Sequence, residues 1–433
     1  MVVTSFGEEV SGLLSRLIQV DTTNPPGNET AAAELLRAYL EANGVVCELY
    51  ARVPERANLV ARIPGSGEGP SLLFLGHTDV VLADASEWSV PPFSGQVRNG
   101  EIWGRGALDM KGHVAANAVA IASLAREGFE PAGDLIFAAT ADEEVGDDFG
   151  LSWLCSEHPE SVRSDYAVNE GGGDRLTVGS DVFWVVATAE KLTAPFTIRV
   201  HGRSGHASMP GIADNALVKA AKLIERIAAY RPEPQIQQEV GVFLQAVLGE
   251  VPSPETAVAR TRERDRTVAE QIEPLLTPTF APTMISASHK RNVIPAVCEI
   301  VVDCRLLPGQ TPEEIEPIVR GVLGGDLEYH LEFLKAEGGT RSALDTPLWE
   351  AVQSFVTELE PAAQPVPVIC AGFTDSHWLR EAFGTVAYGF FPYRSMTPEL
   401  AAMLIHSADE RVPVADLELG VDWLRHVART VCA

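Results

Sequence analysis

The sequence has few cysteines and no long hydrophobic run. Its 6 cysteines are scattered among 433 residues without a CxxC pair, so structural disulfides are not expected. No stretch reaches the ~18 uninterrupted apolar residues of a membrane span. The amino-terminal segment has no basic region and carries Glu8 and Glu9 where a signal peptide would be apolar. We therefore expect a cytoplasmic protein.

Basic residues are also scarce. The chain has 33 Lys and Arg against 60 Asp and Glu, which gives a formal net charge of −27. Such a surface repels phosphate backbones and anionic lipids, so we expect binding to neither nucleic acid nor membrane. Most of the acidic excess is typical of a protein that stays in solution, but a few acids can be ligands whose charge a metal ion cancels.

The length of the chain and the order of its patterns predict two domains, because 433 residues exceed one ordinary core. Apolar strands alternate with helical patterns in the first and last parts, which is typical of an α/β fold with a mainly parallel sheet flanked by helices. The middle part has two-faced strands and indicates a smaller α+β domain. We place the larger domain at 1–191 and 337–433 and the inserted domain at 192–336. A free sheet edge on the inserted domain favours pairing with a second copy of the chain, so a homodimer is expected.

Acids and histidines follow three apolar strands, which we expect at 71–75, 134–140 and 165–169. Loops at the carboxyl ends of strands in an open α/β sheet share one crevice, where ligands bind. Two further residues, in the segments GRGALDMKG and HSADE, complete a set of metal-ligand side chains. The set is His77, Asp109, Glu144, Glu170 and His406. Imidazole and carboxylate ligands in one crevice predict a metallohydrolase.

Each of these residues also has an ordinary alternative when it is taken alone. His77 can be a histidine satisfied at a strand end, and Asp109 can be the N-cap of the Ala-rich helix that follows it. Glu143 and Glu144 can form a solvated turn, and Glu170 can be a turn residue before three glycines. The metal site is favoured because the five candidate ligands occur together, three of them after strands and two in the segments GRGALDMKG and HSADE.

The chemistry of amide hydrolysis assigns roles to two neighbouring acids. Two divalent ions roughly 3.5–4 Å apart activate a water and polarise the carbonyl group. An acid beside a ligand can then carry the proton, and Glu143 lies beside Glu144. A ligating imidazole usually donates its other N–H to a carboxylate, which Asp79 can supply to His77.

Seven motifs carry a resemblance to a known family. They are HTDVV at 77–81, GRGALDMKG at 104–112, ADEEVG at 141–146, SGHASMP at 204–210, NVIP at 292–295, DCR at 303–305 and HSADE at 406–410. Together they resemble the dinuclear zinc aminoacylase, carboxypeptidase and dipeptidase family, which includes acetylornithine deacetylase and succinyl-diaminopimelate desuccinylase. The resemblance covers nearly the whole chain.

The resemblance implies a role for each residue of the metal site. Asp109 would bridge two ions, most simply Zn²⁺ although Co²⁺ or Mn²⁺ also suit the ligands. His77 and Glu170 would complete the coordination of one ion, and Glu144 and His406 would complete that of the other. In the same way, Glu143 resembles the general base, Asp79 the acid that orients His77, and the Asp109–Met110 peptide the cis bond of the family. Glu stands at 170 where other members carry Asp.

The inserted domain resembles the lid and dimerisation domain of the family. His206 resembles the lid histidine that reaches the partner subunit's site and stabilises the oxyanion. Five further residues resemble substrate contacts. They are Asn292, Arg305, Arg341, Gly372 and Thr374. For Arg305 a salt bridge with Asp303 is an equal alternative. Phe373 and the segment AEKL at 189–192 depart from the family motifs, which leaves the substrate open.

We therefore expect metal-dependent hydrolysis of a peptide or N-acyl bond in a small substrate with a free carboxylate. Such substrates include a dipeptide, a C-terminal residue or an N-acyl amino acid, and Arg341 resembles the arginine that pairs with their carboxylate. The alternatives are a dedicated biosynthetic deacylase of the acetylornithine or succinyl-diaminopimelate type, a single-zinc hydrolase of ureido acids, and a non-catalytic relative that only binds metal and ligand. The polar stretch 230–280 is expected to be a solvated addition to the lid.

Overall fold

The computed structural model describes residues 5–146 and 148–433, which form two compact units. Unit 1 comprises Met1–Thr188, Ser342–Val368 and Thr374–Ala433. Unit 2 comprises Ala189–Arg341 and Ile369–Phe373. Among the described helices, none is long and apolar enough to cross a membrane.

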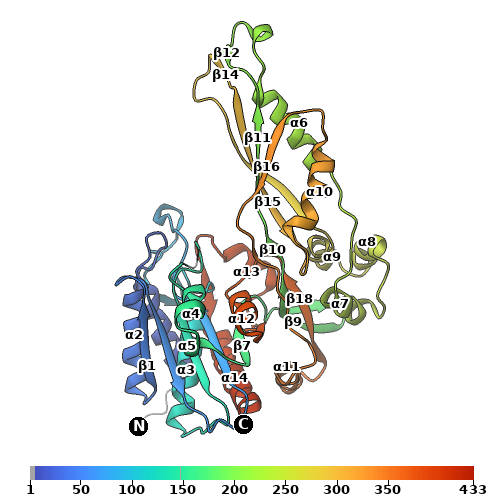
Figure 1. The fold of residues 1–433 in the computed structure, drawn as a ribbon. Helices are drawn as coiled ribbons and strands as arrows, with labels where there is room; N and C mark the ends of the chain where they lie inside the picture. The colour runs from blue at the N-terminus through green and yellow to red at the C-terminus, as the bar shows by residue number, and fades with distance from the viewer. Residues whose placement is uncertain (1–4, 147) are drawn as a thin grey trace. The chain divides into compact units, whose positions relative to one another are not determined.

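A nine-stranded mixed sheet forms the centre of unit 1 (Figure 1). Its order is β1-β2-β6-β3-β7-β19-β9-β18, with β8 beside β9. The strands β6, β3, β7 and β19 run parallel, and the pairs towards β1 and β9 are antiparallel. The predicted α/β class is confirmed, with the parallel strands in the middle of the sheet. The bounds are β1 Val46–Ala51, β2 Ala57–Ile63, β3 Leu72–His77, β6 Leu135–Thr140, β7 Tyr166–Asn169, β8 Arg175–Val178, β9 Asp181–Glu190, β18 Ala363–Cys370 and β19 Val386–Gly389.

Helices cover both faces of this sheet, and β3 shows why its sequence is apolar at every position. Leu72 and Phe74 lie in the core on one face, and Leu73 and Leu75 lie in the core on the other. Successive side chains of a strand point to opposite faces, so a strand between two helical layers has no polar side. The first face carries α1 Phe6–Gln19, α2 Glu29–Ala42, α3 Lys111–Arg126, α11 Pro347–Leu359, α13 Pro398–Leu404 and α14 Val414–Val431. The second carries α4 Leu151–Glu157, α5 Pro159–Val162 and α12 Ser376–Phe383.

A small three-stranded sheet in unit 1 joins two distant parts of the chain. Its strands are β4 Gln96–Arg98, β5 Glu101–Trp103 and β20 Arg411–Pro413. In the pair β5–β20, Trp103 lies opposite Arg411. The segment GRGALDMKG follows β5 and the segment HSADE precedes β20, so this pairing brings the two segments together.

Unit 2 contains a six-stranded sheet in the order β16-β11-β15-β10-β17, with β13 along β15. Alternate residues of β15, such as Ile300 and Val302, are buried in a core shared with α6 and α10. One face of this sheet is therefore covered by helices, as its alternating sequence predicts. The bounds are β10 Leu192–Thr193, β11 Phe196–His201, β13 Thr279–Ser286, β15 Val297–Leu306, β16 Tyr329–Phe333, β17 Glu337–Gly338, α6 Ala216–Ala229 and α10 Pro312–Leu323. A separate pair joins β12 Gly205–His206 to β14 Val293–Ile294.

The polar stretch 230–280 folds mainly as three helices in unit 2. They are α7 Gln238–Leu248, α8 Pro254–Arg264 and α9 Arg266–Ile272. Phe243 and Leu244 of α7 and Val268 of α9 are buried, whereas Arg260 of α8 is exposed and pairs with Glu250. The charged residues of α8 are therefore solvated, as expected, whereas α7 buries the acid Glu239 together with its apolar residues.

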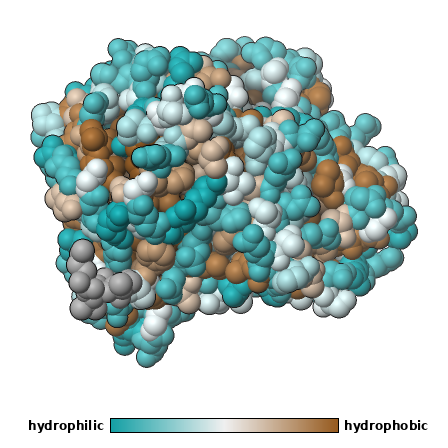
Figure 2. Space-filling view, turned by 90° about the horizontal axis from the view of Figure 1, so that it is seen from below, coloured by the Kyte–Doolittle hydropathy of each residue, from teal (hydrophilic) through white to brown (hydrophobic). Residues whose placement is uncertain are grey.

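The surface agrees with the composition. The face drawn in Figure 2 is largely hydrophilic, and its hydrophobic residues lie in separate patches.

Candidate metal centre

The parallel strands of unit 1 deliver acids and a histidine to one edge of the sheet. β3 ends at His77, whose partner in the parallel register is Thr140 at the end of β6. Glu143 and Glu144 follow β6, and Glu170 follows the end of β7. Since β3 pairs with both β6 and β7, these carboxyl ends are neighbours.

Asp109 lies between two imidazoles. Its Oδ1 is 3.1 Å from His77 Nε2, and its Oδ2 is 3.1 Å from His406 Nε2. Helix α3 has Met110 as its N-cap, so Asp109 does not have the capping role that its sequence position also allowed. A carboxylate with one oxygen towards each histidine has the arrangement of a ligand that bridges two cations. The Asp109–Met110 peptide is cis, as expected.

The glutamates approach the histidines from the other strand ends. Glu144 Oε2 lies 3.3 Å from His406 Nε2. Glu170 Oε1 and Glu143 Oε2 lie 3.8 and 4.0 Å from His77 Nε2. The ligand atoms of His77, Glu143 and Glu170 all lie within 4.8 Å of one another. The structure thus brings the five predicted ligands and the predicted base together.

The protonation of this cluster reflects its excess of buried acids. Burial raises the pKa of Glu143 well above its ordinary value. Burial, with the charge of Asp109, raises the pKa of Glu170 to about 8. Hydrogen bonds to Asp109 and Glu144 raise the pKa of His406 to about 10. Several carboxylates this close together repel one another when they are ionised, so a cation between them is favourable.

The donor set fits resident divalent metal ions. Imidazole nitrogens and carboxylate oxygens are the ligands that zinc, cobalt and manganese accept. Glu144 Oε1 is buried and has no hydrogen-bond partner among the described residues. Buried polar atoms are nearly always paired, so this oxygen points to a ligand role.

Two more acids support the site, and sequence reasoning gave a role to only one of them. His77 Nδ1 lies 3.1 Å from the backbone oxygen of Asp79 and 3.5 Å from its carboxylate. Glu410 had no predicted role. Its Oε1 accepts hydrogen bonds from the backbone N–H groups of Leu108 and Asp109 at 2.7 and 3.1 Å. Its place in the motif HSADE was the signal that could have shown its importance.

The predicted lid residues fall into two groups in unit 2. His206 and Asn292 lie together at the β12–β14 pair, where the N–H of Ala207 donates to the oxygen of Asn292 at 3.0 Å. Arg305 lies where β15 pairs with β10, so the length of β15 separates it from His206. It donates to Asp303 at 2.9 Å and to Thr193 at 2.6 Å. The salt bridge that was the alternative for Arg305 is therefore present.

The remaining predicted substrate contacts have partners within their own units. Arg341 donates to Gln237 Oε1 at 2.8 Å, at the beginning of α7. Gly372 lies close to Arg305, because a Cβ atom added at Gly372 would be 3.8 Å from Arg305 Nη1. Thr374 belongs to unit 1 and is buried. It lies near Gly171, the residue after Glu170, because a Cβ atom added at Gly171 would be 3.8 Å from Thr374 Cγ2.

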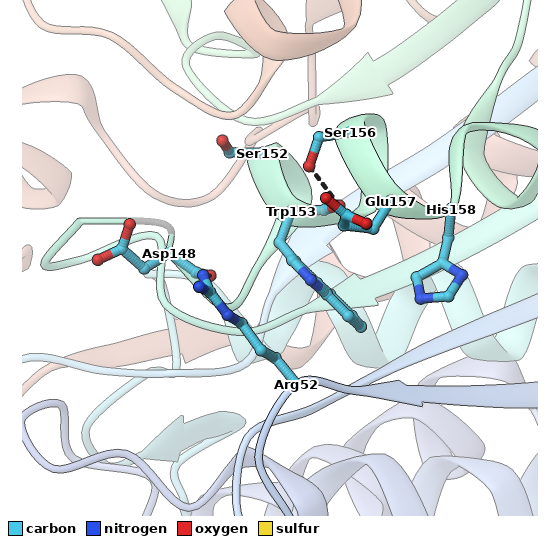
Figure 3. A pocket seen from close by; sticks show the side chains of 7 residues that line it. All are labelled: Arg52, Asp148, Ser152, Trp153, Ser156, Glu157 and His158. Carbon is cyan, nitrogen blue, oxygen red and sulfur yellow. Dashed lines mark hydrogen bonds between the residues drawn. The ribbon is translucent and has the colours of Figure 1, made fainter.

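Another hollow lies on unit 1, and none of the predicted site residues lines it. It measures about 390 Å³ and is drawn in Figure 3. Its lining residues are Arg52, Asp148, Ser152, Trp153, Ser156, Glu157 and His158. Arg52 already donates to the backbone oxygen of Asp148 at 2.9 Å. The hollow is wide and of mixed charge, so it does not compete with the metal centre as the place of the chemistry.

The chain is similar to proteins of known families over most of its length. A family model described as "Peptidase family M20/M25/M40" matches residues 73–430. Succinyl-diaminopimelate desuccinylase of Rhodospirillum centenum is 28% identical over 425 residues, which cover 93% of this chain and 92% of that protein. The human N-fatty-acyl-amino acid synthase/hydrolase PM20D1 is 28% identical over 383 residues, which cover 83% and 74%. The M20 family metallo-carboxypeptidase Sso-CP2 from Sulfolobus solfataricus has the same fold, with a TM-score of 0.73 at 17% identity and coverage of 98% and 99%.

Proposed function

The chain belongs to the peptidase family M20/M25/M40 and is a metal-dependent hydrolase of amide bonds, and we propose that it uses two zinc ions to cleave a small substrate with a free carboxylate. The observation that supports this most is Asp109, whose two oxygens face His77 and His406. His77 and Glu170 would complete the coordination of one ion, and Glu144 and His406 would complete that of the other.

The substrate class is supported by the names of the relatives. One curated relative is named for removal of a succinyl group and the other for fatty-acyl amino acids. We propose an N-acyl amino acid or a dipeptide as the substrate of this chain, with Asn292, Arg305, Arg341, Gly372 and Thr374 as its contacts. A dedicated deacylase of the succinyl-diaminopimelate type is the second candidate, because several of the similar curated proteins carry that name.

The chain's own residues would move the proton and hold the site. Bound zinc would supply Lewis-acid polarisation of the carbonyl group and a more acidic water. Glu143 would take the proton of that water on Oε2 and pass it to the leaving amine. Its place supports this task, because Glu143 Oε2 lies 4.0 Å from His77 Nε2, at the same cluster as the proposed metal ligands. His206 of a second subunit would stabilise the oxyanion.

We propose that unit 2 is the lid and that it forms a homodimer. The edge strand β13 exposes Met284 and Ile285, with 67% and 50% of their surface accessible. Helix α6 exposes Leu217 and Val218. Apolar groups on a free edge strand favour a partner. The cytoplasm stays the predicted location, which cell fractionation would test.

Metal removal and a substrate panel test the proposed function. We expect the apoprotein to be inactive and zinc to restore turnover of one class among N-acetyl, N-succinyl and long-chain N-acyl amino acids and dipeptides. Each substrate is paired with its carboxamide, which lacks the free carboxylate and should react poorly. Ureido acids complete the panel, and turnover of these compounds alone would favour the single-zinc hydrolase of ureido acids. Metal binding without turnover of any compound would favour the non-catalytic alternative.

A further inference from the structure

A buried chain of polar side chains lies behind the acid pair Glu143–Glu144 in unit 1. In order of contact its members are Glu29, Arg56, Asp142, Asn24 and Asp79, and each is at most 6% exposed. They come from the loop before α2, the first residue of α2, the residue before β2, and the segments that follow β3 and β6. Buried polar groups are costly unless they are paired, so a continuous chain of them needs an explanation.

Asn24 joins two carboxylates in this chain. Its Nδ2 donates to Asp79 Oδ2 at 2.9 Å and to Asp142 Oδ1 at 2.8 Å. An amide has two N–H groups, and both are used. Asn24 is also fixed through its backbone, because its N–H donates to the oxygen of Val80 at 2.9 Å. The amide therefore holds Asp79 and Asp142 at a set separation without adding a charge.

Arg56 holds the other end of the chain. Its guanidinium donates two hydrogen bonds to Glu29, both 2.6 Å long, and a third to Asp142 Oδ1 at 2.9 Å. Gly27 leaves the space for it, since a Cβ added there would lie 2.2 Å from Arg56 Nε. A planar, forked cation suits this three-way contact, and lysine does not reproduce it.

One carboxylate of this network, that of Asp79, holds the backbone of the acid pair. The N–H of Glu143 donates to Asp79 Oδ1 at 3.2 Å, and the N–H of Glu144 donates to Asp79 Oδ2 at 3.1 Å. Asp142, directly before the pair, has a φ of 64°. This left-handed conformation is uncommon for a residue other than glycine and is tolerated best by Asn and Asp.

We propose that Asn24 and Arg56 are positioning residues for the metal centre: they fix Asp79 and Asp142, and through them the places of the base Glu143 and the ligand Glu144. This inference rests on the proposed function for its effect on turnover, but its effect on metal binding does not need a substrate. The first loop of the polypeptide, DTTNPPGNET, then has a part in the reaction although it contributes no metal ligand.

The substitution Asn24→Ala tests this inference. Loss of the amide leaves two buried carboxylates without a shared donor, and outer partners of metal ligands typically contribute 10–100-fold. We expect the apoprotein of this variant to bind Co²⁺ about 10–100-fold more weakly in competition with a chelator, and the visible spectrum of bound Co²⁺ to change. With a substrate in hand, kcat should fall by a similar factor while KM changes little.

Three further variants make the outcome clear. Asp142→Asn keeps the left-handed backbone and one acceptor oxygen for Asn24, so it should bind Co²⁺ nearly as tightly as the unmodified protein. Arg56→Lys keeps the charge but not the fork, and should weaken Co²⁺ binding in the same direction. Asn43→Ala is the matched control, because Asn43 donates to the backbone of Tyr39 and accepts from Arg126, far from the acid pair along the chain.

A merely structural role predicts another pattern. In that case Asn24→Ala lowers the Tm but leaves the Co²⁺ affinity and spectrum as in the unmodified protein, and the proposal is overturned. If Asn24→Ala does not fold, Arg56→Lys decides by the same two measurements: weaker Co²⁺ binding supports the proposal, and unchanged binding with a lower Tm overturns it. Normal metal binding without turnover in the unmodified protein would instead count against the proposed function alone.

Discussion

Glu143 and Glu144 are neighbours in the chain, yet their side chains have different surroundings. Glu144 faces His406 at 3.3 Å and keeps a buried oxygen without a hydrogen-bond partner among the described residues. Glu143 lies 4.0 Å from His77 and has a strongly raised pKa because it is buried. Two acids in one turn can therefore be separated by substitution, one as base and the other as ligand.

The substitution Glu143→Gln removes the basic oxygen and keeps the size of the side chain. We expect kcat to fall by about 10²–10⁴-fold, because general-base catalysis contributes that much, while the metal content stays unchanged. Metal content is measured by elemental analysis after gel filtration. Glu144→Gln is the matched variant and should lose metal. Equal metal loss in both variants would make Glu143 a ligand, a role that its group with His77 and Glu170 also allows.

The sequence alone predicts the site residues that directly follow apolar strands. It does not predict residues whose hydrogen-bond partners lie far away along the chain. His77 and Glu170 could be found because a ligand directly after a strand is a local pattern. Asn24 lies 55 residues from Asp79 and 118 from Asp142, and nothing local in its loop indicates those contacts. Glu410 contacts a backbone about 300 residues away. Such partners follow from the folded topology alone.

At the scale of elements, continuous apolar runs were the most reliable signal. The predicted strands 71–75, 134–140 and 165–169 correspond to β3, β6 and β7, because strands buried on both faces have no polar position. The stretch 230–280 gave no such signal. Its helix α8 buries only Ala257 and Thr261 and keeps the composition of a solvated segment, and its charges concealed the apolar face that α7 buries with Val240, Phe243 and Leu244.

Helix α14 depends on one small residue for its packing. A Cβ added at Gly420 would lie 2.1 Å from Phe391 Cζ. The ring of Phe391 cannot move away easily, because it stacks on the imidazole of His113 with 4.0 Å between centroids. Overpacking of this kind costs roughly 1–3 kcal/mol.

We therefore expect Gly420→Ala to lower the Tm of the apoprotein by several degrees in calorimetry with a chelator present. Gly12→Ala is the control, because Gly12 lies in α1 with open space around its Cα. That change should instead stabilise by about 0.5–1 kcal/mol, since alanine favours a helix more than glycine does. If both substitutions raise the Tm, the contact between Gly420 and Phe391 does not restrict α14.

At the scale of the whole molecule, unit 2 carries its predicted site residues at two separate ends. β12 and β14, with His206, form one end, and β10, next to Arg305, lies at the other (Figure 1). Between them runs β15, a strand of 10 residues, so the two ends are roughly 25–30 Å apart. One small substrate cannot contact both residues of the same unit 2. If both residues act in catalysis, they act at different sites. This supports a dimer in which His206 of each subunit reaches the site of the other subunit.

Mixed dimers test this exchange. His206→Ala and Glu143→Gln should each be nearly inactive as homodimers. Co-expression with two different tags allows the heterodimer of the two variants to be purified. One of its sites then combines an intact Glu143 with an intact His206 from the other subunit, so we expect about half of the unmodified activity. A heterodimer as inactive as its parents would place His206 at its own subunit's site or outside catalysis. His330→Ala is the control, because His330 is an exposed histidine on β16 of unit 2 and should leave activity unchanged in every combination.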